Sequence, residues 1–135
     1  MDQILSFIRK YMPSLLNTDR YKVAEVNETA VNGGDSIVVV ISSGVQFRFI
    51  TDRDQLFLDL RPPTSQKEKD WYSIDLVYRL LTGERLGTSI LSPEYADFVR
   101  TRLSDIERKF GPDEWPQTEK GLIGVQRKRS KEMFG

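Results

Sequence analysis

Apolar and polar side chains alternate most strictly in the stretch VQFRFITDRDQLFLDLRPP, which spans residues 45–63. The apolar positions that share one side of its two runs are Val45, Phe47 and Phe49, then Leu56, Leu58 and Leu60. Alternation with period 2 is typical of strands with one buried face, and a short polar break between two such runs predicts a hairpin. The break is Asp52-Arg53-Asp54, and Pro62-Pro63 ends the second strand because proline has no N–H to donate.

Two more strands are predicted before this hairpin. One covers residues 21–27, and the next is Ile37–Ile41, whose five consecutive β-branched residues indicate a central strand covered on both faces. Asn32-Gly33-Gly34-Asp35 and Ser42-Ser43-Gly44 are turn signals, since glycine and asparagine tolerate positive φ. Four strands joined by such short turns form an antiparallel meander.

Three segments have the three- and four-residue apolar spacing of a helix with one buried side. The first covers residues 4–11. The second covers residues 74–81, with Asp70 or Ser73 as its N-cap. The third begins with a serine cap followed by proline and glutamate, and is expected to run without interruption over residues 92–110.

The C-terminal segment has the weakest pattern. Residues 118–134 are expected to be a frayed helix or an extended arm, and Gly121 and Gly124 disfavour a stable helix. We therefore expect one α+β domain over residues 1–116 and a basic C-terminal tail or weak helix over residues 117–135. The domain is expected to be a four-stranded antiparallel meander with an N-terminal helix and two C-terminal helices packed on the sheet.

The chain contains neither histidine nor cysteine. This composition excludes disulfides, thiolate zinc sites, Ser-His-Asp triads and His-ligated metals, so we expect no catalytic residues, metal site or cofactor. Residues 1–116 carry 15 Lys and Arg against 18 Asp and Glu, whereas residues 117–135 carry 5 against 2. A mildly acidic body makes nucleic-acid binding an unexpected function.

No apolar run reaches the roughly 20 residues that a membrane span needs. The first residues, MDQILSFIRKYM, carry an early aspartate and lack a small-residue cleavage site, so they do not have the pattern of a signal peptide. A cytoplasmic protein that makes no membrane contact is therefore expected.

Asp59 and Arg61 lie two residues apart on a predicted strand, so their side chains are expected to share a face. An acidic residue followed in this way by lysine is part of the restriction-type nuclease core, where it holds Mg²⁺ and orients water. Arginine keeps its proton near neutral pH, so we expect a polar face and not a catalytic pair. The competing hypothesis is a small nucleic-acid-binding or metal-dependent nuclease-like protein that uses these two residues or the basic segment 127–131.

The order of elements, with FRFITDRDQLFLDLRP followed by WYSIDLVYRLLTG, resembles small immunity proteins of bacterial toxin–immunity systems, including contact-dependent inhibition. The resemblance covers roughly residues 1–111 and is one of layout. It implies a cytoplasmic protein that binds one cognate toxin domain and blocks its active site, without catalysis of its own. The expected contact residues are Asp52, Arg53, Asp54, Asp59 and Arg61, with Trp71 and Tyr72 as candidate aromatic anchors. A homodimer is the remaining alternative.

Overall fold

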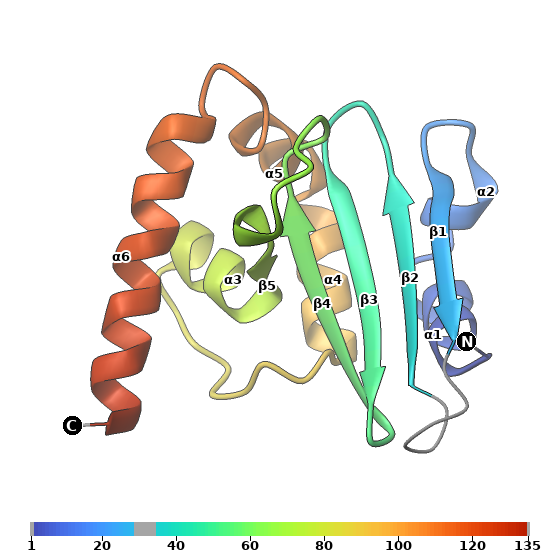
Figure 1. Cartoon of the computed structure of the whole chain (residues 1–135), viewed down its shortest axis with the longest axis horizontal. Coiled ribbons are helices and arrows are strands. Elements are labelled where there is room, and N and C mark those ends of the chain that lie inside the picture. Colours follow the sequence, from blue (N-terminus) through green and yellow to red (C-terminus); the bar gives the residue numbers. More distant parts are fainter. Residues whose placement is uncertain (1, 29–34, 135) are drawn as a thin grey trace.

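The computed structural model describes residues 2–28 and 35–134 and has an α+β fold with one antiparallel sheet (Figure 1). Its strands are β1 (Lys22–Glu28), β2 (Ser36–Ile41), β3 (Gln46–Asp52), β4 (Gln55–Arg61) and β5 (Tyr72–Ser73). Their order in the sheet is their order along the chain. The expected four-stranded sheet is thus extended by β5, which is too short to leave a periodic pattern in the sequence. Residues 32–34 of the predicted first turn lie outside the described residues.

The helices cover one face of the sheet and its β5 edge. They are α1 (Asp2–Tyr11), α2 (Ser14–Asn17), the 3₁₀ turn η1 (Glu68–Asp70), α3 (Ile74–Thr82), α4 (Pro93–Thr101), α5 (Leu103–Lys109) and α6 (Trp115–Phe134). In Figure 1, α1 and α4 lie behind the strands, whereas α3 and α6 lie beyond β5. No helix in the described part of the chain is long and apolar enough to cross a membrane.

The core lies between the sheet and the helices behind it. The predicted alternation is confirmed, since Phe47 pairs with Leu60 and Phe49 with Leu58, and all four side chains are fully buried. Burial of each such side chain contributes about 1.5–3 kcal/mol relative to exposure. The helices contribute further fully buried side chains, among them Ile4, Ile8, Tyr95 and Ile106.

The turn between β3 and β4 contains two residues with left-handed backbone, Arg53 (φ 53°) and Asp54 (φ 66°). Positive φ at both central residues is the geometry of a type I′ hairpin turn, which matches the twist of the flanking strands. Asp52, which the sequence assigned to the turn, is the last residue of β3 and pairs with Gln55. Gln3 of α1 donates its Nε2 hydrogen to the carbonyl of Asp54 at 3.0 Å, so α1 holds this end of the sheet.

In the described part of the chain no α-helix lies on the second face of the sheet, and only η1 and the loop before it reach one end of that face (Figure 1). We call this surface the open face. Strand register places on it Lys22, Glu25, Asn27, Ile37, Val39, Ile41, Gln46, Arg48, Ile50, Asp52, Gln55, Phe57, Asp59 and Arg61. The expectation that Ile37–Ile41 is covered on both faces holds only for its middle, since Val39 is 5% exposed, whereas Ile37 and Ile41 are partly exposed. Its β-branched residues reflect a central place in the sheet without a second covering layer.

The helix predicted over residues 92–110 is interrupted at Arg102, whose φ of −111° and ψ of 19° separate α4 from α5. The hydroxyl of Thr101 donates to the carbonyls of Asp97 and Phe98, at 2.8 and 3.3 Å. Bonds of this kind from threonine to the preceding turn bend helices. The apolar spacing continues through the bend, which is why the pattern indicated one helix.

The segment expected as a tail or weak helix forms α6, a 20-residue helix that packs on α3. Leu122 is fully buried, and Thr118 is 5% exposed. A Cβ at Gly121 would lie 2.8 Å from Leu80 Cδ1, so this glycine permits the close approach of the two helices. Tertiary contact therefore outweighs low helix propensity. The expected boundary between residues 116 and 117 falls inside α6.

Glu107 of α5 joins the turn between β2 and β3 to the residues before β1, and the hydroxyl of Ser42 in that turn donates to its carboxylate at 3.4 Å. Glu107 accepts hydrogen bonds from Arg20 at 2.6 Å and from the hydroxyl of Tyr21 at 3.0 Å. Burial is the first cause that raises the pKa of Tyr21, to about 12, and the neighbouring Glu107 carboxylate adds to it. Gly44 lies directly against this side chain, since a Cβ there would be 2.9 Å from Glu107 Cβ.

We expect Gly44→Ala to lower the free energy of unfolding by about 1–3 kcal/mol, the usual cost of forcing a methyl into an occupied space. Urea denaturation measures the change. Gly124→Ala is the matched control, because nothing lies within 4 Å of a Cβ there and alanine favours the helix by up to about 1 kcal/mol. Equal stability of Gly44→Ala and the wild type would contradict the close contact with Glu107.

Candidate functional site

A tryptophan in contact with two arginines stands at one end of the open face. Trp71 follows η1, and the guanidinium carbons of Arg48 and Arg61 lie 4.5 and 4.2 Å from its ring centroid. A guanidinium within about 6 Å of a tryptophan ring centroid is attracted by the ring's negative face, by about 0.5–2 kcal/mol. We call Arg48, Trp71 and Arg61 the Trp71 stack. It joins β3, β4 and the segment before β5.

Carboxylates fix the first arginine of the Trp71 stack. Arg48 donates to Asp59 on the paired strand at 2.7 Å and to Glu68 of η1, also at 2.7 Å. Burial alone lowers the pKa of Arg48, but the hydrogen bonds to Glu68 and Asp59 outweigh burial, and the net shift raises it. Arg48 is therefore a permanently charged residue held in one orientation under the tryptophan ring.

The second arginine of the Trp71 stack is held only by neutral groups. Arg61 donates to Gln46 Oε1 at 2.9 Å and to the carbonyl of Lys67 at 3.4 Å. Among the described residues no carboxylate forms an ion pair with it, and its Nε is buried without a hydrogen-bond partner. Burial accordingly lowers the pKa of Arg61. This cation is available to a carboxylate from another molecule.

Of the residues predicted as contacts, the structure brings Asp59, Arg61 and Trp71 together. Asp59 and Arg61 share the open face, and each bonds to a different residue, Asp59 to Arg48 and Arg61 to Gln46. Among the described residues no three Asp or Glu side chains lie close enough together to hold a metal ion. Asp52 shares the open face at the opposite end of the strands, beside the turn residues Arg53 and Asp54.

Tyr72 is not a surface anchor, which corrects the sequence interpretation. It is 6% exposed, pairs with Leu60 on the covered side of the sheet, and meets Trp115 edge-on at 6.0 Å between ring centroids. Neighbouring residues of an extended segment point to opposite faces, so Trp71 and Tyr72 cannot both lie on the open face. Burial raises the pKa of the Tyr72 hydroxyl.

Sequence reasoning missed three residues of this site, Gln46, Arg48 and Glu68. The signal for Arg48 was present: a two-residue turn after Asp52 places residue 48 opposite residue 59. Gln46 donates to the carbonyls of Pro62 and Ser65 at 2.8 and 2.9 Å, which folds the following loop over this end of the sheet. That loop path brings Glu68 to Arg48, and no local sequence pattern encodes it.

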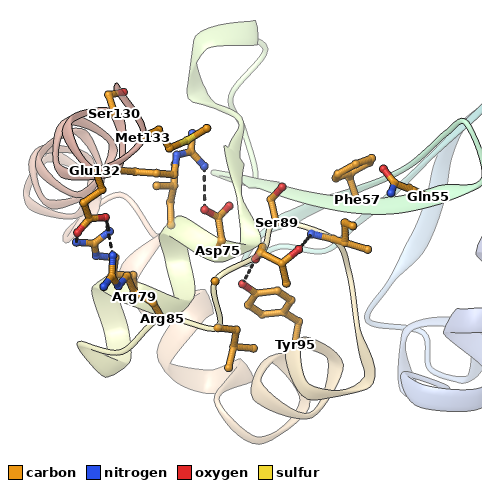
Figure 2. Close-up of a pocket in the computed structure, with 16 residues that line it drawn as sticks. Gln55, Phe57, Asp75, Arg79, Arg85, Ser89, Tyr95, Ser130, Glu132 and Met133 are labelled. Atoms are coloured by element: carbon orange, nitrogen blue, oxygen red, sulfur yellow. Dashed lines mark hydrogen bonds and ion pairs between the residues drawn. The ribbon is translucent and has the colours of Figure 1, made fainter. Parts of the chain in front are cut away.

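A pocket opens beside the end of the open face that is far from the Trp71 stack (Figure 2). It encloses about 840 Å³ between β4, α3, the loop before α4 and the C-terminal half of α6. Gln55 and Phe57 belong both to the open face and to the pocket wall. Met133, which is 68% exposed, lines the opposite wall on α6. The pocket is therefore an extension of the open face.

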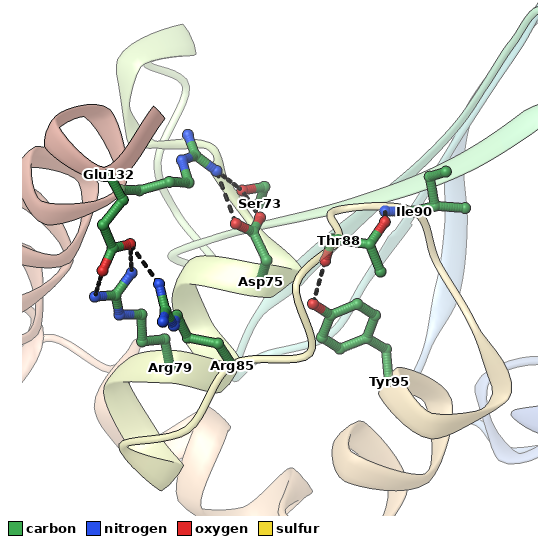
Figure 3. Close-up of polar contacts among 9 residues, drawn as sticks. Ser73, Asp75, Arg79, Arg85, Thr88, Ile90, Tyr95 and Glu132 are labelled. Atoms are coloured by element: carbon green, nitrogen blue, oxygen red, sulfur yellow. Dashed lines mark hydrogen bonds and ion pairs between the residues drawn. The ribbon is translucent and has the colours of Figure 1, made fainter. Parts of the chain in front are cut away.

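Ion pairs between α3, the following loop and α6 hold the pocket together (Figure 3). Arg79 donates to both carboxylate oxygens of Glu132, at 2.8 and 3.0 Å, and Arg85 reaches the same carboxylate at 2.8 Å. Arg129 pairs with Asp75 at 2.9 Å. The hydrogen bonds from Arg79 lower the pKa of Glu132. These arginines are already paired with carboxylates and hold α6 in place. The pocket therefore offers a binding partner a cavity and little unpaired charge.

Comparisons of the chain with protein-family models, with curated proteins and with solved structures found no match. A function for the open face therefore rests on its own residues and geometry.

Proposed function

We propose that this chain is a non-catalytic cytoplasmic protein that binds a cognate toxin domain and neutralises it, as immunity proteins do. The partner binds the open face. The observation that carries the proposal is the Trp71 stack, a tryptophan and two arginines on a sheet face that no α-helix among the described residues covers.

The residue types of the open face support a protein interface. Tryptophan and arginine are enriched among the residues that contribute most to protein–protein binding. Ile37, Ile50 and Phe57 add partly exposed apolar surface toward the other end of the strands. The arginines of the Trp71 stack are already held by Asp59, Glu68 and Gln46, so binding costs less side-chain entropy there.

The shape and charge of the surface favour a particular kind of partner. Arg61, without a carboxylate of its own among the described residues, fits an acidic side chain at the edge of the partner's interface. The pocket beside Phe57 fits a protruding loop. The open face carries both signs of charge, Lys22, Arg48 and Arg61 with Glu25, Asp52, Asp59 and, at its edge, Glu68, whereas a phosphate backbone requires an excess of cations.

Asp52→Lys is expected to weaken capture of the partner about threefold to tenfold, because reversing a charge at the rim of an interface slows association. Tagged wild type and variants serve as bait in a lysate of the source cells, and the captured partner is then purified for binding measurements. Asp52 is preferred to Asp54, since lysine would be strained at the positive φ of residue 54.

Asp113→Lys is the matched control, because it makes the same charge change at an exposed position outside the sheet, between α5 and α6. The control is expected to capture the partner as well as the wild type does. Equal capture by both variants would remove this end of the open face from the interface. Nucleic acid in place of a protein partner would favour the alternative function through the basic residues of α6.

A further inference from the structure

The outer edge of β1 is an exposed strand edge with apolar side chains. β1 is the terminal strand of the sheet, and its residues 22–27 are all exposed. Val23 and Val26 are 45% and 46% exposed, although they pair with Val40 and Val38, which the helices bury completely. A strand edge of this kind presents unpaired N–H and C=O groups and is a template for a further strand.

A bulge gives β1 an unusual distribution of side chains. The register with β2 shifts between Val23 and Glu25, so Ala24 is an extra residue in the strand. The shift places Val23 and Val26, three residues apart, on the same covered side of the sheet. On the opposite side, Lys22 and Glu25 pair with Ile41 and Val39 and therefore share the open face.

We propose that β1 pairs in antiparallel fashion with β1 of a second copy of this chain, about a two-fold axis between Ala24 and Glu25. In this register Val23 of each copy lies opposite Val26 of the other, with all four valines on one side. The bulge of one strand faces the bulge of the other, so the extra residue does not displace the pairing. The exposed side chains of Val23 and Val26 in one copy then cover those of the other copy.

The charges of β1 select the same register. Lys22 of one copy lies diagonally opposite Glu25 of the other on the open face, a separation that a lysine side chain spans, and symmetry repeats the pair. An axis moved onto Glu25 would instead place this carboxylate opposite its own copy, and like charges directly opposite destabilise a sheet. An axis moved onto Ala24 would place Val23 opposite Glu25.

The dimer does not depend on the proposed function. The axis stands perpendicular to the sheet, so one continuous sheet runs from β5 of one copy to β5 of the other. Both open faces lie on the same side of that sheet. The two Trp71 stacks bridge β3 and β4, away from the joined β1 edges, and stay accessible to a partner.

Cysteine cross-linking tests the register, because the chain contains no cysteine of its own. Val23→Cys combined with Val26→Cys is expected to give a covalent dimer after mild oxidation, detected on a non-reducing gel. Within one strand the two positions are about 10 Å apart, too far for an internal disulfide. Each single variant is expected to cross-link no more than Ile90→Cys, a partly exposed loop position. Equal yields from the double and single variants would overturn the register.

Sedimentation of the unmodified chain tests the dimer itself. We expect a mass that rises with concentration from 15.6 kDa towards twice that value. Val26→Lys is expected to weaken the dimer at least about tenfold by placing a charge opposite Val23. Ile90→Lys, the same change at an apolar side chain that is 37% exposed, is expected to leave it unchanged. A monomer at all concentrations up to about 1 mM, or a dimer insensitive to Val26→Lys, would overturn the proposal.

Discussion

Trp71→Ala is expected to weaken binding of the purified partner about 30-fold or more, a loss of about 2 kcal/mol or more in binding free energy. The ring is a large amphipathic surface on the open face, in contact with the guanidinium groups of Arg48 and Arg61. Its removal deletes contact area and also the ring that both guanidinium groups contact. A tryptophan in this setting is the type of residue on which binding energy concentrates.

Isothermal titration calorimetry measures this loss, and denaturation of the variant establishes that it remains folded. Arg48 keeps Asp59 and Glu68, and Arg61 keeps Gln46, so the sheet retains its polar contacts in the variant. Trp71→Phe is expected to bind with intermediate affinity, since it keeps a ring. Unchanged affinity of Trp71→Ala would exclude the Trp71 stack from the interface.

Leu122→Ala is expected to lower the free energy of unfolding by about 2–5 kcal/mol, the range measured for removing a buried leucine from a core. Leu122 is fully buried and belongs to the cluster that includes the core residues of β3 and β4. Its position in α6 makes the substitution a test of whether the C-terminal segment belongs to the fold.

Guanidinium chloride denaturation measures this loss, and Gln126→Ala supplies the comparison in the same helix. Gln126 is exposed, so its substitution is expected to change stability by no more than about 0.5 kcal/mol. A C-terminal segment that is a solvated tail would make both substitutions neutral, and that result would contradict the packing of α6 on α3.

The β3–β4 hairpin was predictable because its evidence is local. Its period of 2, its short polar break and the prolines after it are all within 19 consecutive residues. The break of three residues in the sequence is a two-residue turn in the structure, which sets the register of Phe47 with Leu60. The segment 115–134 was not predictable as a firm helix. Its glycines lower helix propensity, and the compensating contact of Gly121 with Leu80 joins residues far apart in the sequence.

In the candidate site, the sequence predicted the face of the sheet only for residues that lie on alternating strands. Asp59 and Arg61 were placed on one face correctly, because residues two apart on a strand share a face. By the same rule, adjacent residues of an extended segment point to opposite faces. Trp71 and Tyr72, which the sequence interpretation had treated as a pair, are therefore on different faces. The contacts of Arg48 with Glu68 and Trp71 depend on how the loop before β5 folds back, and side-chain bonds from Gln46 hold this path.

The placement of the two tryptophans gives the chain two intrinsic fluorescent reporters with separate meanings. Trp71 lies in the stack on the open face, whereas Trp115 begins α6 and stacks on Phe110 at 5.3 Å between ring centroids. With only these two indoles present, replacement of either by phenylalanine leaves a single tryptophan. The emission of Trp71 alone then reports binding at the open face, and the emission of Trp115 alone reports packing of α6, without any attached dye.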